Sequence, residues 1–131
     1  MSGVTELQRI SEQVVARFGA AHRTLGTAES LTGGMIASSV ADVSGASAVL
    51  MGGVVSYDPR VKHEVLGVSR QVIDTVGVVS EPCARQMAEG ARLAGAVNWA
   101  GMGEESQFAA ICEKNKRSIK IIKPYDDEDM V

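Results

Sequence analysis

The chain has 131 residues, of which 45% are hydrophobic and 22% charged, and its formal net charge is −3. A chain of this length fits one domain, which can bury about two-thirds of its unfolded surface without disulfides or metals. The small negative charge disfavours a nucleic-acid partner, because binding a phosphate backbone needs clustered basic residues.

The cysteines and the apolar runs narrow the class further. Cys83 and Cys112 form no CxxC motif and lie near no pair of histidines, which disfavours a disulfide scaffold and a zinc site. The first residues lack the basic and apolar regions of a signal peptide. The longest apolar run, residues 48–55, is far shorter than the ~20 residues of a membrane span. We therefore expect a reduced, cytoplasmic, single-domain globular protein without a membrane partner, a metal or another cofactor.

Composition favours an α/β fold. Aromatic residues make up only 4% of the chain, and small residues suit helices that pack closely on a buried sheet. The first helix is expected to begin after Thr5, which forms a capping box with Gln8, and to end near Gly19. Residues 25–28 then predict a short buried strand.

A turn at residues 30–34 follows this strand and leads into a second helix, expected to end before Gly45. The inner face of that helix is expected to consist of Leu31, Met35, Ile36, Ser39 and Val40. Residues 48–57 predict a second strand, in which Gly52 and Gly53 indicate the close approach of another backbone.

Two short helices with clear boundaries come next. Asp58 is expected to cap the first helix, with Pro59 at its first position and Gly67 at its end. Ser69 is expected to cap the second helix, which Gly77 ends.

A longer helix is expected to begin at residues 80–82 and to be followed by a strand near Val97. One face of this helix is formed by Ala84, Met87, Ala88, Ala91 and Ala94. Helices that alternate with buried strands predict a layered α/β domain.

Charged residues become denser after about residue 113. We therefore expect a domain over residues 1–112 and a charged tail over residues 113–131, in which residues 119–122 could add one edge strand. The acidic end of this tail is expected to be a solvated terminus or, alternatively, a partner-binding segment.

The turn after the first strand is the strongest candidate for a functional site. Ser30 lies where a strand meets the start of a helix, so its hydroxyl is exposed and the first amides of the helix face a ligand. Gly33 and Gly34 let a substrate approach the backbone. Such a turn could hold a phosphate or stabilise an oxyanion; alternatively, Ser30 only caps its helix.

Lys62 is the second candidate. With Asp58 as the cap, Lys62 lies within about the first turn of its helix, where the helix dipole disfavours positive charge. In a desolvated site its pKa would fall towards the range of a general base, and serine–lysine pairs carry out acyl transfer on other scaffolds. The alternative is an ordinary surface lysine. Tyr57 could orient a substrate or donate a proton, or it packs in the core at the end of the strand.

The other polar residues have simpler explanations. Glu81 fits the start of a helix, where the dipole favours a carboxylate. His22 and His63 have no partner at a catalytic or metal-binding spacing. Cys83, on a predicted helix, is expected to be buried and unreactive.

Four ordered segments together resemble the C-terminal domain of CinA, in the competence/damage-inducible protein family. They are Ala28-Glu29-Ser30-Leu31-Thr32-Gly33-Gly34, Asp42-Val43 with Gly45 and Ser47, Gly53-Val54-Val55 with Tyr57 and Lys62, and residues 77–91. The resemblance covers roughly residues 6–97. The family includes stand-alone nicotinamide-nucleotide amidohydrolases of the PncC type.

The resemblance implies a three-layer α/β/α domain that hydrolyses the carboxamide of nicotinamide mononucleotide to nicotinate mononucleotide and ammonia, without a metal. By position, Ser30 would be the nucleophile, Lys62 the base, and Tyr57 would lie beside them. The implied substrate-binding residues are Glu29, Thr32, Gly33, Gly34, Ser47, Gly53, Ser80 and Glu81. The partner would be a small pyridine nucleotide, and assembly into a homo-oligomer stays open.

The match to the family ends near Val97. Family members continue with an apolar strand, a Val-Thr-Gly-Ile-Ala-Gly-Pro loop, two more strands and a closing helix, which residues 98–103 do not match. An incomplete sheet is therefore expected, with edges left uncovered unless a partner covers them. The alternative function is that of a truncated, catalytically inactive family remnant that binds a nucleotide or another subunit.

Overall fold

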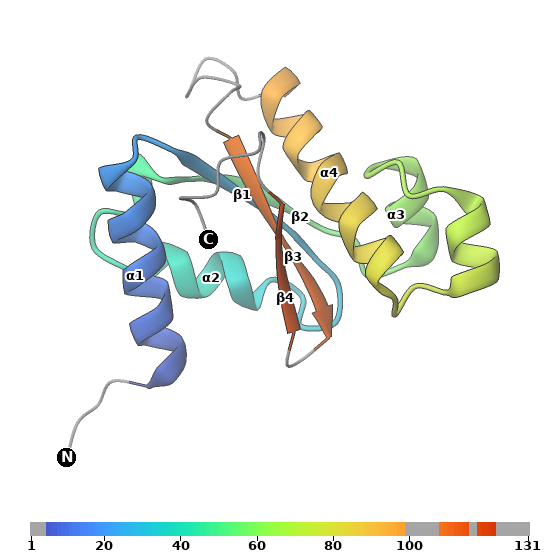
Figure 1. The fold of residues 1–131 in the computed structure, drawn as a ribbon, viewed down its shortest axis with the longest axis horizontal. Helices are drawn as coiled ribbons and strands as arrows, with labels where there is room; N and C mark the ends of the chain where they lie inside the picture. The colour runs from blue at the N-terminus through green and yellow to red at the C-terminus, as the bar shows by residue number, and fades with distance from the viewer. Residues whose placement is uncertain (1–4, 99–107, 116–117, 123–131) are drawn as a thin grey trace.

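The structure, a computed structural model, describes residues 5–98, 108–115 and 118–122. Its elements alternate between helix and strand along the first half of the chain (Figure 1). The helices are α1 (Glu6–Ala20), α2 (Met35–Ala41), α3 (Pro59–Glu64) and α4 (Glu81–Asn98), with short helical turns at Ala46–Ala48 and Val72–Val76. The strands are β1 (Thr24–Glu29), β2 (Leu50–Val55), β3 (Phe108–Asn115) and β4 (Ser118–Ile122).

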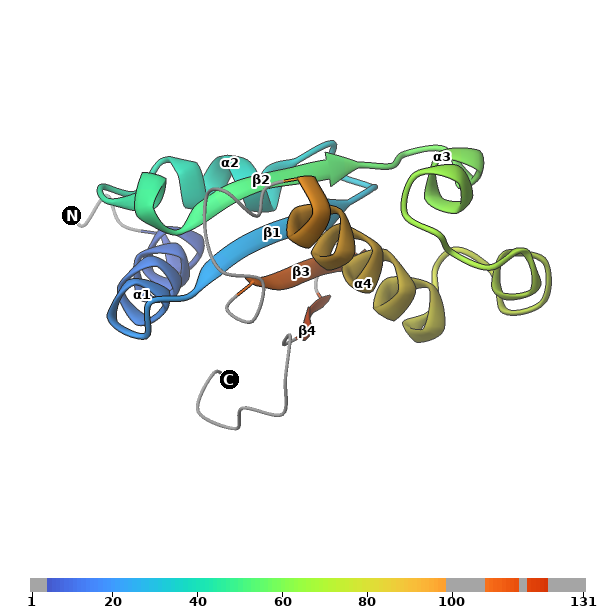
Figure 2. The same ribbon diagram turned by 90° about the horizontal axis from the view of Figure 1, so that it is seen from above.

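The four strands form one mixed sheet in the order β2-β1-β3-β4 (Figure 2). β1 pairs in parallel with both β2 and β3, whereas β4 is antiparallel to β3. Within the described residues, β2 and β4 are therefore the edge strands. The register of the first pair ends with Glu29 opposite Val55, so β1 and β2 finish at the same edge of the sheet.

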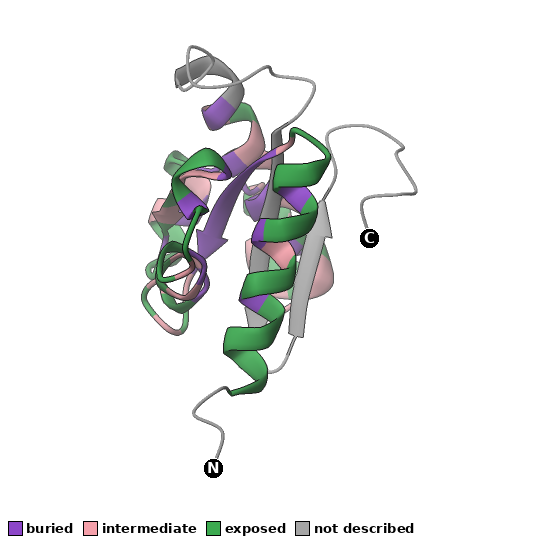
Figure 3. Cartoon of the chain, turned by 90° about the vertical axis from the view of Figure 1, so that its left-hand side faces the viewer, coloured by how far each residue is buried: buried purple, intermediate pink, exposed green. Residues whose placement is uncertain are grey.

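Helices cover both faces of the sheet, which makes the domain a three-layer α/β/α sandwich (Figures 1 and 2). On the side of α1 and α2, the buried apolar cluster consists of Val15, Phe18, Leu25, Ile36, Val40, Ala46 and Val49. On the side of α4, it consists of Ala28, Leu66, Val68, Cys83, Ala84, Met87, Ala88 and Ala91. Side chains of a strand alternate between faces, so β1 contributes to both clusters and is buried along its whole length (Figure 3). The predicted α/β fold class is confirmed.

Helix starts with a local cap agree with the sequence, whereas α3 ends at Glu64, before the expected Gly67. Thr5 and Gln8 form the expected capping box at the start of α1. Asp58 caps α3 by accepting a hydrogen bond from the amide of Arg60 at 2.8 Å, and Pro59 is the first residue of this helix. The predicted close approach of another backbone is confirmed at Gly53, where a Cβ would lie 3.2 Å from the carbonyl oxygen of Thr27 and 2.1 Å from its Oγ1.

Expectations about the second helix and the second strand were partly wrong. Ile36 and Val40 are buried, as expected of the inner face, whereas Leu31 and Met35 are exposed. Leu31 lies outside the helix, because α2 begins only at Met35. The predicted strand over residues 48–57 is shorter, since a 3₁₀ turn ends at Ala48 and β2 occupies only Leu50–Val55.

The strand expected near Val97 was wrong as well, because α4 continues to Asn98. The next strand is β3, and it crosses the change in composition at residue 113. The edge strand expected at residues 119–122 is confirmed as β4. The acidic end of the tail lies outside the described residues. None of the helices in the described part of the chain is long and apolar enough to cross a membrane.

Candidate functional site

Parallel pairing of β1 and β2 brings two loops together at one edge of the sheet. Ser30 directly follows β1, and Ser56 and Tyr57 directly follow β2. Ser56 extends the ladder by one step, because its amide donates to the carbonyl oxygen of Glu29 at 2.7 Å. The loop after β2 then enters α3, which carries Lys62 back towards the strand ends.

The amine of Lys62 contacts both strand ends. Lys62 Nζ donates to Ser30 Oγ at 2.8 Å, to the Ser56 carbonyl oxygen at 2.5 Å and to the Tyr57 carbonyl oxygen at 3.3 Å. Lys62 is only 2% exposed, so its interpretation as a surface lysine is wrong. The expected proximity of this amine to the Ser30 hydroxyl is confirmed, whereas the catalytic role of the pair stays a prediction.

The backbone of Lys62 is fixed on both sides. Its amide donates to the Asp58 carbonyl oxygen at 3.2 Å, and its carbonyl oxygen accepts from the amide of Val68 at 3.0 Å. The cap of α3 and the segment that follows this helix therefore both hold the lysine in register with the strand ends.

The start of α2 is capped by Glu29 and Thr32. The carboxylate of Glu29 accepts from the amides of Ile36 at 2.6 Å and Ala37 at 2.9 Å, and Thr32 Oγ1 accepts from the amide of Met35 at 3.1 Å. The capping interpretation of Ser30 is wrong, because Glu29 and Thr32 accept the hydrogen bonds of the first amides of α2. The expectation that these first amides of α2 face a ligand is also wrong, since all three are already bonded.

Glycine shapes the turn that carries Ser30. Gly33 and Gly34 have φ angles of 72° and 121°, which other residues rarely adopt. The amide of Gly33 donates to the carbonyl oxygen of Ser30 at 3.1 Å, which closes the turn. The two predicted pocket glycines therefore lie beside the serine, within the same turn.

Three other predicted site residues, Tyr57, Ser47 and Gly53, differ in their exposure and in their contacts. Tyr57 is 70% exposed, so the interpretation that it packs in the core is wrong. Its backbone carbonyl oxygen accepts a hydrogen bond from Lys62 Nζ. Ser47 is exposed in the 3₁₀ turn before β2. Gly53 lies inside β2 and packs on Thr27.

Ser80 and Glu81 lie at the start of α4. Ser80 Oγ donates to the Gly77 carbonyl oxygen at 2.7 Å and accepts from the amide of Cys83 at 3.3 Å, so Ser80 caps the helix. Glu81 pairs with Arg85 at 3.0 Å on the surface. Substrate contacts by these residues stay a prediction.

Cys83 connects this helix start with Lys62 electrostatically. The thiol is fully buried, as predicted. Burial raises the pKa of the Cys83 thiol, and the positive charge of Lys62 acts in the opposite direction. The start of α4 is therefore within electrostatic reach of the amine.

Sequence reasoning missed Ser56. This residue is fully buried and holds Glu29 through its amide and hydroxyl, while its carbonyl oxygen holds Lys62. The available signal was its position: like Ser30, Ser56 is a small polar residue directly after an apolar strand.

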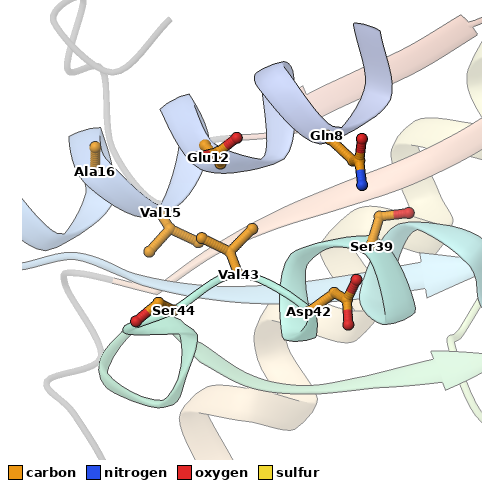
Figure 4. A pocket seen from close by; sticks show the side chains of 8 residues that line it. All are labelled: Gln8, Glu12, Val15, Ala16, Ser39, Asp42, Val43 and Ser44. Atoms are coloured by element: carbon orange, nitrogen blue, oxygen red, sulfur yellow. The ribbon is translucent and has the colours of Figure 1, made fainter. Parts of the chain in front are cut away.

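Two cavities are found among the described residues. One of about 410 Å³ lies between α1 and α2 and contains none of the predicted site residues (Figure 4). Its lining consists of Gln8, Glu12, Val15, Ala16, Ser39, Asp42, Val43 and Ser44. Another, of about 510 Å³, includes Glu81. Across the residues that the structure describes, no three His, Cys, Asp or Glu side chains are grouped to hold a metal ion.

Comparison with known proteins gives consistent matches. The family model for the CinA C-terminal domain matches residues 7–101. A CinA-like protein of Anaeromyxobacter dehalogenans is 48% identical over 94 residues, which are 72% of this chain and 23% of that protein. A CinA-like protein of Leptospira borgpetersenii is 54% identical over 68 residues, which are 52% of this chain and 16% of that protein.

Solved structures agree with the fold. A competence/damage inducible protein, CihA from Agrobacterium tumefaciens, has a TM-score of 0.67 and 30% identity, covering 86% of this chain and 64% of its own. A CinA superfamily protein from Escherichia coli has a TM-score of 0.69 and 26% identity, covering 86% and 59%. The chain spans less than a quarter of the length of the two curated relatives above. Because the family model covers most of its residues, the chain belongs to the CinA C-terminal domain family.

Proposed function

We propose that this chain is an amidohydrolase that converts nicotinamide mononucleotide and water into nicotinate mononucleotide and ammonia. Family membership supports the choice of reaction. The observation that carries the proposal is the 2.8 Å hydrogen bond between the buried Lys62 Nζ and Ser30 Oγ. A serine hydroxyl in contact with a desolvated amine is the arrangement that a serine–lysine acyl transfer needs.

In the first half of the reaction, Ser30 Oγ attacks the carbonyl carbon of the carboxamide while its proton moves to the neutral amine of Lys62. The tetrahedral intermediate then collapses, the carbon–nitrogen bond breaks, and Lys62 returns the proton to the leaving nitrogen, which departs as ammonia. The acid part of the substrate is left as an ester on Ser30.

In the second half, water attacks this ester and gives a proton to Lys62. The ester bond breaks, Lys62 reprotonates the Ser30 oxygen, and nicotinate mononucleotide leaves. One amine serves as base and acid in each half, so no metal step is needed to balance the protons.

The carbonyl oxygens of Ser56 and Tyr57 prepare Lys62 for this role. Each accepts a hydrogen bond from the amine, at 2.5 and 3.3 Å, and these two bonds fix the rotation of the amino group. Burial disfavours the charged form of a lysine. When the amine is neutral, its two N–H bonds can stay on these carbonyls while its lone pair faces Ser30.

The test is ammonia release from nicotinamide mononucleotide by the purified chain. Ser30→Ala and Lys62→Met should each lower kcat by roughly 10²–10⁴-fold, because each removes one partner of the proton transfer. Ser44→Ala, at an exposed serine outside the pair, is the matched control and should keep the wild-type rate. Turnover that survives Ser30→Ala would remove Ser30 from the mechanism, and a wild-type chain without turnover would refute the hydrolase.

Nucleotide binding without hydrolysis is the second candidate. One observation favours it: the amides of Met35, Ile36 and Ala37, which could have stabilised an oxyanion, are bonded to Thr32 and Glu29. Under this alternative, calorimetry detects binding of nicotinamide mononucleotide while the ammonia assay stays at background.

A further inference from the structure

Glu29 is a buried carboxylate next to the proposed nucleophile, and both ends of the residue are held. Its two carboxylate oxygens accept from the amides of Ile36 and Ala37 at 2.6 and 2.9 Å. Its backbone oxygen accepts from the amide of Ser56 at 2.7 Å and from Ser56 Oγ at 3.3 Å. The side chain thus ties β1 to α2, and the backbone ties β1 to the end of β2.

The turn that carries Ser30 lies inside this connection. Residues 30–34 join Glu29 to α2, and Gly33 and Gly34 in this turn have positive φ angles. Gly34 stands at the N-cap position of α2 and has no side chain with which to cap the helix. Glu29 directly precedes this turn, and its carboxylate binds Ile36 and Ala37, which follow the turn. These bonds therefore fix the two ends of the turn relative to each other.

The bonding of Glu29 differs from that of a substrate ligand. The residue is 0% exposed, and both carboxylate oxygens are engaged by backbone amides. Hydrogen bonds to an ionised carboxylate are stronger than those between neutral groups, and the positive end of a helix dipole strengthens them further.

We propose that Glu29 is a positioning residue, whose carboxylate clamps α2 against the end of β1 and so keeps Ser30 Oγ within reach of Lys62 Nζ. The clamp acts on the serine through the turn, and not through contact with substrate. Its effect on turnover rests on the proposed function, whereas its effect on the reactivity of Ser30 does not.

Glu29→Gln tests the clamp with little change in volume. A glutamine amide presents an NH₂ group where one backbone N–H needs an acceptor, so one of the two bonds is lost. A misplacement of about 1 Å can cost about 10²-fold in rate, so we expect kcat to fall 10- to 100-fold. The KM should stay within about threefold, because the substrate contacts remain. A residue that binds substrate would instead raise KM at nearly unchanged kcat.

Glu12→Gln is the matched control, because Glu12 is an exposed carboxylate on α1 and the same chemical change there should leave both constants unchanged. Glu29→Asp keeps the buried charge but shortens the side chain by one methylene. It is the second variant if the glutamine variant does not fold, and its kcat should also fall.

Labelling by a fluorophosphonate, followed by mass spectrometry at Ser30, separates the clamp from the choice of substrate. We expect Ser30 to be labelled at least tenfold more slowly in Glu29→Gln than in the wild type and in Glu12→Gln. Equal labelling rates would overturn the clamp, and so would a wild-type Ser30 that does not react. Labelling of Ser30 without release of ammonia would refute only the proposed function.

Discussion

Gly90→Ala should destabilise the domain, although alanine is the better helix former. Gly90 lies in α4 where this helix crosses the chain after α3. A Cβ on Gly90 would lie 2.0 Å from the carbonyl oxygen of Leu66, 2.7 Å from its carbonyl carbon and 2.8 Å from its Cα. All three are backbone atoms, so no side-chain rotation relieves the overlap, and α4 must move away from Leu66 by more than about 1 Å.

The expected magnitude follows from two opposing effects. Replacing glycine by alanine inside a helix gains about 1 kcal/mol. Overpacking a well-packed core costs about 1–3 kcal/mol, and occasionally more. The cost of an overlap with backbone atoms lies at the upper end of this range, because moving α4 away from the segment around Leu66 also opens the apolar cluster that contains Leu66, Ala88 and Ala91. The net loss in the free energy of unfolding should be about 2 kcal/mol.

Urea unfolding of the purified domain measures this difference. Gly19→Ala is the matched control in α1, where a Cβ would lie 3.9 Å from Val49 Cγ2, an ordinary contact. That variant should be as stable as the wild type or slightly more stable. If Gly90→Ala matched the control, α4 could not lie as close to Leu66 as the structure places it.

Two further predictions concern β2 and the start of α4. Gly53→Ala should lower the free energy of unfolding by about 1–3 kcal/mol, because the new Cβ would lie 2.1 Å from the buried Thr27 Oγ1; unchanged urea unfolding would contradict this. Burial raises the pKa of the Cys83 thiol above its ordinary value of 9.0, although Lys62 opposes the shift. The folded state then keeps a proton that the unfolded state loses, so this contribution to stability is complete below pH 9 and is lost as the pH rises through the folded-state pKa. The stability difference between wild type and Cys83→Ala should therefore shrink from pH 7 to pH 10 in urea unfolding, and a difference independent of pH would refute it.

Sequence reasoning succeeded where a signal and its structural effect lie within a few residues of each other. The capping box of Thr5 and Gln8 and the Asp58-Pro59 start of α3 are such cases, because the bonds that cap a helix form within its first turn. The expected inner face of α2 was partly wrong because Leu31 has helical spacing but precedes the helix. Periodicity alone could not reveal that the turn continues to Gly34.

The caps of α2 were not predictable in the same way. Glu29 bonds to residues seven and eight positions further along the chain, across a turn whose geometry depends on positive φ angles. From sequence alone, Ser30 is the better capping candidate, because serine caps helices often and Glu29 still belongs to the strand. The choice depends on where the strand ends relative to the helix, which is a property of the tertiary fold.

The sequence places Ser30 and Lys62 each near the start of a helix, but the pairing of the strands is what brings them together. Two helix starts need not converge, whereas the carboxyl ends of adjacent parallel strands must lie at the same edge of a sheet. Ser30 follows β1, and Lys62 returns to that edge because α3 begins only four residues after β2 ends. The same strand ends supply the carbonyl oxygens of Ser56 and Tyr57, which bind the amine directly. A lysine can therefore be buried here because backbone acceptors replace water around it, and these acceptors stay in place whichever side chain occupies position 30. A loss of activity in Ser30→Ala would then result from the missing serine hydroxyl, and not from a displacement of Lys62.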